Sequence, residues 1–288
     1  MSIEEIIKMY EKLPQGGAFL DILGNNSVHD VFLSGLMASA TPVFFASLAK
    51  KCSSPFIFIL DDADEAGYFY NDLRAALSSS QKEGKESVFF FPSGYKRAVK
   101  YGQKDNASEI LRTEVLARLS SCKQESHEAV FIVTYPQALS ELVVAQHNLD
   151  SRLIALRVGQ EVSLAALERQ LREFGFEETD YVYEPGQFAV RGSILDVFSY
   201  SCEYPFRIDF FGDEIDTVRT FELETQLSKE KRNEIEIVPA LAKMESEKVS
   251  FLSFVPENAI IVGKDFKFVQ DVIDKTYQEG FSSQALVE

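Results

Sequence analysis

Apolar residues in the first half of the chain gather in short runs without internal alternation, and most runs are followed by a segment with helical spacing. The expected strands are 28–33, 55–60, 88–91 and 129–134, and the expected helices are 41–51, 64–77, 108–119 and 136–144. Continuous apolar strands, each followed by a helix, are typical of a parallel sheet covered on both faces. The pattern therefore predicts an α/β domain of nucleotide-binding type.

The pattern changes near residue 150. A strand-like run at 152–158 precedes an amphipathic helix at 163–174, with Ser163 as its N-cap, and an antiparallel meander follows at 185–221. Residues 226–233 are polar and are expected to form a loop, whereas 259–262 and 266–277 return to strand and helix. The simplest architecture is an α/β domain interrupted by an inserted α+β domain. The expected divisions are 1–150, 151–238 and 239–288, with the last segment completing the first domain.

One strand of the meander places an aromatic ring on its outward face. Side chains of a strand point alternately to opposite faces. In FRIDFF the expected buried side chains are Phe206, Ile208 and Phe210, and the expected outward ones are Arg207, Asp209 and Phe211. An aromatic residue beside an arginine on a solvent face is typical of a protein-binding hot spot.

Arg191 is a further candidate for this face, because it alternates with Val190 in the preceding strand. Gly192 after it allows a bulge that would redirect the side chain. The structural alternative is that Arg191 and Arg207 pair with nearby carboxylates such as Asp196 and Asp209, and that Phe211 covers a loop. Both interpretations stay open at the level of residues alone.

The 288 residues carry a formal net charge of −16, which opposes sequence-independent binding to the DNA backbone. The three cysteines are widely spaced and form no CxxC pair, so neither a zinc site nor a disulfide framework is expected. No apolar run approaches the roughly 20 residues of a membrane span, and the amino terminus lacks a signal-peptide core. A cytoplasmic protein without a membrane partner is expected.

A single basic and aromatic cluster lies in GYKRAVKYGQKDN, from Lys96 to Lys104. Lysine and arginine interleaved with tyrosine would suit contact with a nucleic-acid backbone. The alternative is a solvated connecting loop, which the acidic composition of the whole chain favours.

The segment FLSGLMASATPVFF lies where a phosphate-binding loop would be expected. Such a loop requires GxxxxGK[ST], in which Lys contacts the phosphate oxygens and Ser or Thr binds Mg²⁺. With Gly35 as the first glycine, Ala40 takes the place of the second, Thr41 that of the lysine, and Pro42 that of the metal ligand. Both the cation and the metal-binding hydroxyl are missing, so no nucleotide or metal cofactor is expected.

Three consecutive stretches of the meander, PGQFAVRGSILDVF, EYPFRIDFFGDEID and VRTFELETQ, resemble the UvrB-like amino-terminal module of the bacterial transcription–repair coupling factor family. The resemblance is strongest here and extends with lower similarity over the whole chain. It implies that the chain is a fragment of a longer protein whose ATP-driven DNA translocase domains lie elsewhere. In this family two arginines and a phenylalanine dock the excision-repair protein UvrA, and they correspond to Arg191, Arg207 and Phe211.

The resemblance also implies further partners and further losses. The full protein would act at stalled RNA polymerase on DNA, and the docking face would be masked by the rest of its own chain in the resting state. The acidic motif of the motor fold would fall at 263–266, where Lys264 replaces the glutamate that orients the attacking water. The 94–106 loop is also too short for the aromatic hairpin with which UvrB separates DNA strands.

Asp61, Asp62, Asp64 and Glu65 look like a metal cluster, but acidic residues in the first turn of a helix are also favoured by the helix dipole. The sequence thus predicts a non-catalytic module that recruits UvrA. The alternatives are an active nucleotide-binding, DNA-unwinding domain of UvrB type and a purely structural domain.

Overall fold

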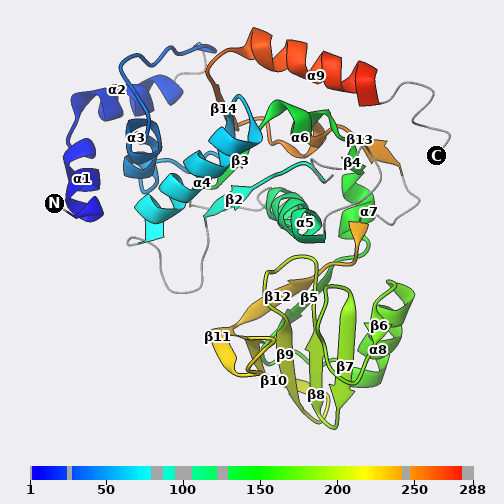
Figure 1. Ribbon diagram of the computed structural model, residues 1–288. Helices are drawn as coiled ribbons and strands as arrows, with labels where there is room; N and C mark the ends of the chain where they lie inside the picture. Colours follow the sequence, from blue (N-terminus) through cyan, green and yellow to red (C-terminus); the bar gives the residue numbers. More distant parts are fainter. Residues whose placement is uncertain are drawn as a thin grey trace. The chain divides into compact units, whose positions relative to one another are not determined.

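The computed structural model describes residues 2–24, 28–78, 87–94, 106–121, 129–241 and 247–280 (Figure 1). The chain forms two compact units. Unit 1 comprises Met1–Phe91, Cys122–Ala138 and Val255–Ser282, and unit 2 comprises Pro92–Ser121, Leu139–Phe254 and Ser283–Glu288. Each unit is described by itself below.

Unit 1 is built on a parallel sheet of four strands in the order β14-β1-β3-β2. The strands are β1 (Phe56–Ile59), β2 (Val88–Phe90), β3 (Phe131–Thr134) and β14 (Ile260–Gly263). Every residue of β1 and β3 is buried, so both faces of the sheet centre are covered, as the absence of alternation predicted. β14 pairs with β1 from Phe56↔Ile260 to Ile59↔Gly263, so the last strand of the described chain lies in the same sheet as the first.

The helices of unit 1 are α1 (Ile3–Tyr10), α2 (Pro14–Leu23), α3 (Ala40–Leu48), α4 (Ala63–Ser78) and α9 (Phe266–Gly280). Ser2 and Glu5 form a capping box at the start of α1. The buried ring of Phe45 in α3 packs edge-to-face on the sheet, 4.9 Å from Phe58 between ring centroids. Aromatic rings of the helix and the sheet thus contribute to the core of this unit.

Two expectations for residues 28–144, which include parts of both units, are wrong. Residues 28–33 form no strand: Val31 and Phe32 are consecutive and both exposed, so neither face of a strand here would be buried. The helix expected at 136–144 is shorter, because α6 (Pro136–Ser140) is followed by the strand β4 (Val143–Val144). The β-branched valines of β4 suit a strand, and they pair with β13 (Lys248–Val249).

Unit 2 contains the predicted antiparallel meander in a sheet of six strands, in the order β11-β10-β9-β8-β7-β6. They are β6 (Glu177–Glu178), β7 (Gln187–Arg191), β8 (Ile194–Val197), β9 (Phe206–Phe211), β10 (Glu214–Phe221) and β11 (Ser228–Arg232). β6 pairs with β7 in parallel and the other neighbours are antiparallel. The sequence thus correctly predicted both a parallel and an antiparallel sheet.

The helix α8 (Leu164–Glu173) packs its apolar side against one face of this sheet. Leu167 and Leu171 join a core with Phe188, Leu195 and Ile208, all at most 1% exposed. Ser163 occupies the N-cap position as expected, although its side chain makes no capping hydrogen bond. This core fixes which face of the sheet is covered by α8.

The loop expected at 226–233 is wrong, because it contains the edge strand β11. Its residues Ser228 to Glu230 and Lys231 are exposed, and the strand pairs with β10 through its backbone. Because the side chains of this edge strand are mostly charged, the hydrophobic pattern does not predict a strand here. Charged side chains on an edge strand also discourage pairing with other chains.

Unit 2 also contains β4 and β13, together with α5 (Asn106–Ser121), α7 (Gln146–Asp150), η2 (Phe251–Phe254), β5 (Ile154–Arg157) and β12 (Glu234–Ile237). β5 and β12 pair in antiparallel fashion. The basic loop from Lys96 to Lys104 lies outside the described residues, as does Cys122, whereas Cys52 and Cys202 are free thiols. Among the described residues, no helix has both the length and the apolar character to cross a membrane.

Candidate functional site

The alternation predicted for β9 is confirmed. Phe206, Ile208 and Phe210 are at most 6% exposed, and Phe211, the last residue of the strand, is 81% exposed. Gly212 follows with φ +65°, a left-handed conformation that glycine adopts without strain in the tight turn to β10. The turn thus ends the strand directly after the outward-facing ring.

The register of the sheet brings both candidate arginines to the face that carries Phe211. Asp196 of β8 is directly opposite Arg207 of β9, and Ile194 is opposite both Arg191 of β7 and Asp209 of β9. Residues opposite one another in adjacent strands point to the same face. Arg191, Asp196 and Arg207 therefore lie together on the face opposite the core.

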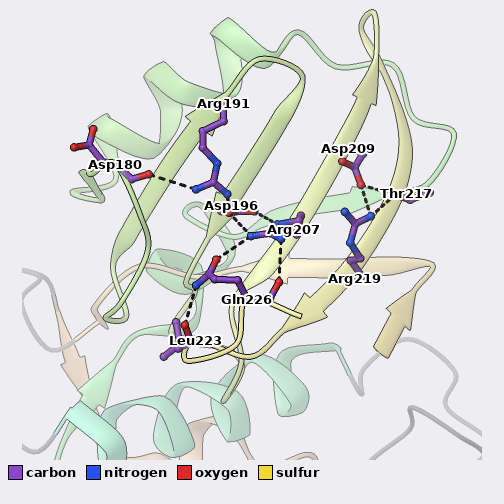
Figure 2. A network of polar contacts seen from close by, with 9 residues as sticks. All are labelled: Asp180, Arg191, Asp196, Arg207, Asp209, Thr217, Arg219, Leu223 and Gln226. Carbon is purple, nitrogen blue, oxygen red and sulfur yellow. Dashed lines mark hydrogen bonds and ion pairs between the residues drawn. The ribbon is translucent and has the colours of Figure 1, made fainter. Parts of the chain in front are cut away.

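A single carboxylate joins the two arginines (Figure 2). Asp196 is 1% exposed and accepts hydrogen bonds from Arg207 Nε at 2.7 Å and Arg207 Nη2 at 2.8 Å. Arg191 Nη2 donates a third hydrogen bond to Asp196 Oδ2. The sequence had suggested Asp196 as the partner of an arginine, and the structure shows that it binds both.

Arg207 is held from the other side by the connection between β10 and β11. Gln226, with φ +57°, accepts from Arg207 through its backbone oxygen at 3.3 Å and its Oε1 atom at 3.1 Å. The guanidinium also lies 4.2 Å from the centroid of the Phe221 ring, a cation–π contact. Hydrogen bonding to Asp196 raises the pKa of Arg207 above its usual value. Its side chain is only 13% exposed, so Arg207 is more enclosed than its outward position predicted.

Arg191 is the more open of the pair, with 34% of its side chain exposed. Its Nη1 atom donates to the backbone oxygen of Asp180 at 3.4 Å, and its guanidinium lies 4.9 Å from the centroid of Tyr181. Tyr181 is 50% exposed and extends the aromatic character of the face. The sequence pattern gave no sign of Tyr181, which lies in the connection between β6 and β7.

Asp209 takes part in a separate ion pair on the same face. It binds Arg219 of β10, and Thr217 Oγ1 donates to its Oδ2 atom at 2.8 Å (Figure 2). The suggestion that Asp209 pairs with Arg191 or Arg207 is therefore wrong. Cross-strand register explains this, because Arg219 is beside Arg207 in the sheet and its long side chain reaches Asp209.

Phe211 lies on the same face but not beside the arginines. It is four residues beyond Arg207 in β9, which corresponds to about 14 Å along a strand. We define a candidate docking face, called the docking face below, as Arg191, Asp196, Arg207 and Phe211, with Tyr181 at its margin. The face thus combines an ordered pair of guanidinium groups with an exposed aromatic ring.

In the segment expected to be a degenerate phosphate loop, backbone N–H groups form hydrogen bonds within the segment itself. The N–H groups of Ala40 and Thr41 donate to the carbonyl oxygens of Met37 and Ala38, so they are turned toward their own loop. Gly35 has φ +87°, and Pro42 is buried in the first turn of α3. A phosphate cradle instead needs N–H groups pointing at the ligand.

The acidic residues after β1 have two roles in the structure. Asp62 Oδ1 accepts from the N–H groups of Asp64 and Glu65, at 2.8 and 2.9 Å, and so caps α4. Lys264 binds the carboxylates of Glu65 and Asp61, the latter at 3.4 Å. The hydrogen bond to Glu65 is the main cause of a raised pKa for Lys264. No group of three or more His, Cys, Asp or Glu that could hold a metal ion occurs within the described parts of the chain.

Residues 154–242, which carry the docking face, match the family described as the UvrB interaction domain. The chain is 38% identical over 216 residues to a transcription-repair-coupling factor of Myxococcus xanthus, covering 72% of this chain and 17% of that protein. It is 27% identical over 216 residues to the factor of Bacillus subtilis, with 75% and 17% covered. It is also 26% identical over 243 residues to the UvrABC system protein B of Lactococcus lactis, with 82% and 35% covered.

The resemblance to the UvrB-like module of the transcription–repair coupling factors, which the sequence motifs indicated, is confirmed by these matches. The chain spans about a sixth of the length of the coupling factors and about a third of the UvrB protein that it matches.

Proposed function

We propose that this chain is a non-catalytic UvrB-like module that recruits the nucleotide-excision-repair protein UvrA. The docking face would meet UvrA through Arg191, Arg207 and Phe211. Guanidinium groups bind carboxylates by charge-assisted hydrogen bonds, and an exposed ring contributes by burial against the partner. UvrA is therefore expected to present acidic side chains beside an apolar depression.

The observation that carries the proposal is the pair of arginines ordered around buried Asp196, on the sheet face opposite the core. The pair lies within the residues that match the UvrB interaction domain. Two guanidinium groups against one carboxylate leave this cluster with an excess positive charge, in a chain whose net charge is −16. A local cation excess is a suitable feature for selecting an acidic partner surface.

The proposal assigns different roles to two parts of the chain. Residues 1–150 and 239–288 would form an α/β domain with a degenerate phosphate loop at Gly35, Ala40, Thr41 and Pro42, and 151–238 would be inserted into it as the partner-binding domain. In this reading the α/β domain needs neither ATP nor Mg²⁺, because it supports the inserted domain and performs no reaction.

The wider protein is part of the same proposal, because this chain spans 17% of the coupling factors that it matches. ATP-driven translocation on DNA and contact with stalled RNA polymerase would belong to domains outside this chain. The remainder of the protein would mask the docking face until translocation exposes it, and the whole would act in the cytoplasm.

A pulldown of purified UvrA by the immobilised chain tests the proposal directly. Wild-type chain should retain UvrA, and the Arg191→Ala and Arg207→Ala variants should retain much less while still folded by circular dichroism. Absence of retention by the wild type at micromolar concentrations of both proteins would contradict the proposal.

A second candidate is an active nucleotide-binding domain of UvrB type, which the 28% identity to the UvrABC system protein B of Streptococcus uberis favours. Thr41, Pro42 and Lys264 argue against it, because they stand where a phosphate-binding lysine, a metal-binding hydroxyl and a catalytic carboxylate are needed. Titration of the chain with Mg-ATP by calorimetry distinguishes the two candidates.

A further inference from the structure

Asp196 lies in β8, between the two strands that contribute the arginines of the docking face. It is 1% exposed although it points away from the core, because Arg191 and Arg207 cover it. A carboxylate in such a position contributes little surface to a partner. What it does is fix the positions of two side chains that would otherwise repel each other.

The hydrogen bonds require a carboxylate and not only a side chain of its shape. Arg207 uses both oxygens of Asp196, Oδ1 at 2.7 Å and Oδ2 at 2.8 Å, and Arg191 shares Oδ2 (Figure 2). An ionised carboxylate only accepts hydrogen bonds, whereas an amide would turn an NH₂ group toward guanidinium donors. Asparagine at this position would keep the volume but lose one acceptor and the charge.

The two arginines differ in how far they are exposed and in what holds them. Arg207 is 13% exposed and is fixed by Asp196 and Gln226, whereas Arg191 is 34% exposed and stacks on half-exposed Tyr181. Asp196 thus links an enclosed arginine to an open one. Holding a side chain in its bound geometry before association lowers the entropic cost of binding.

We propose that Asp196 is the positioning residue of the docking face: held in place by Arg207, it orders Arg191 for contact with a carboxylate of the partner. The inference rests on the proposed function of this face and adds the device that prepares it. Asp196 itself does not touch the partner.

Asp196→Asn and Asp209→Asn form a matched pair of variants. Both remove one negative charge from the same face of the same sheet, but Asp209 binds Arg219 and not Arg191 or Arg207. In titrations of purified UvrA, Asp196→Asn should lower affinity by about tenfold or more, as expected when a hot-spot contact is disordered. Asp209→Asn should change affinity by no more than about twofold, as is usual outside a hot spot.

A double-mutant cycle separates positioning from a general effect on the fold. If Asp196 acts through Arg191, the loss caused by Asp196→Asn should become much smaller in an Arg191→Ala background. Equal losses in both backgrounds would overturn the proposal, because they would show that Asp196 acts independently of the arginine.

The wild-type chain offers a measurement that needs no folded variant. By NMR, the Nε–H proton of Arg207 should exchange with water much more slowly than that of Arg169, an exposed arginine of α8. Equal exchange rates would show that the hydrogen bond to Asp196 does not hold Arg207 in place in solution. The proposal needs Arg207 as the anchor of Asp196, so this result would overturn it even if Asp196→Asn unfolds.

The outcomes separate this inference from the proposed function. If wild type binds UvrA and Arg191→Ala does not, while Asp196→Asn binds like wild type, the inference fails and the proposed function stands. If wild type itself fails to bind UvrA, the proposed function fails, and the positioning role falls with it.

Discussion

The two units each contain a cluster of three charged groups, and the clusters are opposite in sign and in burial. In unit 2 one carboxylate, Asp196, lies between two guanidinium groups and is 1% exposed. In unit 1 one ammonium group, Lys264, lies between the carboxylates of Asp61 and Glu65, with a side chain 57% exposed. Ion pairs in water contribute little, whereas a buried charge that loses its partner is costly.

The two clusters are built from the same kind of ion pair but differ in how far they are exposed to solvent. In unit 1 the resemblance would place a catalytic glutamate at position 264, and the lysine found there pairs with Asp61 and Glu65 at a largely exposed site. The Asp196 cluster instead immobilises two cations at a surface. Unit 2 thus holds its charged groups around a buried carboxylate, whereas those of the Lys264 cluster remain exposed to solvent.

The largest expected effect is on stability at Asp196. Asp196→Ala leaves Arg207 without its carboxylate in an enclosed site, so the free energy of unfolding should fall by about 3–5 kcal/mol. Asp209→Ala, which breaks a less enclosed pair with Arg219, should cost about 1 kcal/mol. Urea denaturation of both variants measures the difference, and similar losses would contradict the contrast between buried and open ion pairs.

A comparably large contrast is expected between two neighbours in β9. Phe210→Ala removes a ring that is 6% exposed and should destabilise the chain by about 3–5 kcal/mol. Phe211→Ala removes an 81% exposed ring and should leave the melting temperature nearly unchanged. A one-residue shift of register exchanges the two faces. If Phe211→Ala unfolds the chain and Phe210→Ala does not, the face assignment is wrong.

A small effect is expected at Lys264. Lys264→Ala should lower the free energy of unfolding at pH 7 by less than about 1 kcal/mol, because the pair is exposed and screened. The carboxylates raise the folded-state pKa of Lys264, so its contribution is complete below the unfolded-state pKa and is lost as pH rises through the folded-state value. Denaturation curves of wild type and variant should therefore differ slightly at neutral pH and coincide at strongly alkaline pH. A variant that loses several kcal/mol at pH 7 would show that this cluster is structural.

No effect at all is expected from nucleotide. Calorimetric titration with Mg-ATP at physiological concentrations should give only heats of dilution, because Thr41 and Pro42 supply neither the cation nor the metal ligand of a phosphate loop. A saturable isotherm, or ATPase activity that copurifies with the chain, would favour the nucleotide-binding candidate. It would also contradict the view that unit 1 binds no nucleotide.

The hydrophobic pattern predicted the features that burial controls. It gave the parallel strands β1 and β3, the helix α4, the meander, and the opposite faces of Phe210 and Phe211. It failed at β11, whose residues are held by backbone pairing at an edge, and at residues 28–33, where an apolar run remains exposed.

The docking face was predicted only in part, for a related reason. Strand alternation selected Arg207 and Phe211, but the partners of the arginines depend on side-chain reach across three strands. Asp209 therefore pairs with Arg219, contrary to expectation. Gln226 reaches Arg207 from a turn with positive φ, and Tyr181 reaches Arg191 from a loop, and neither position carries a periodic signal.

The central claim is that the exposed ring and the ordered arginines of unit 2 bind UvrA. The most direct test compares the dissociation constants of purified UvrA for wild type, Phe211→Ala and Phe32→Ala. Phe32 is a matched control because it is also a highly exposed phenylalanine, at 90%, but belongs to unit 1. We expect Phe211→Ala to weaken binding about thirtyfold, a hot-spot loss of about 2 kcal/mol, and Phe32→Ala to bind like wild type. Equal affinity of all three proteins, or a loss confined to Phe32→Ala, would contradict the account.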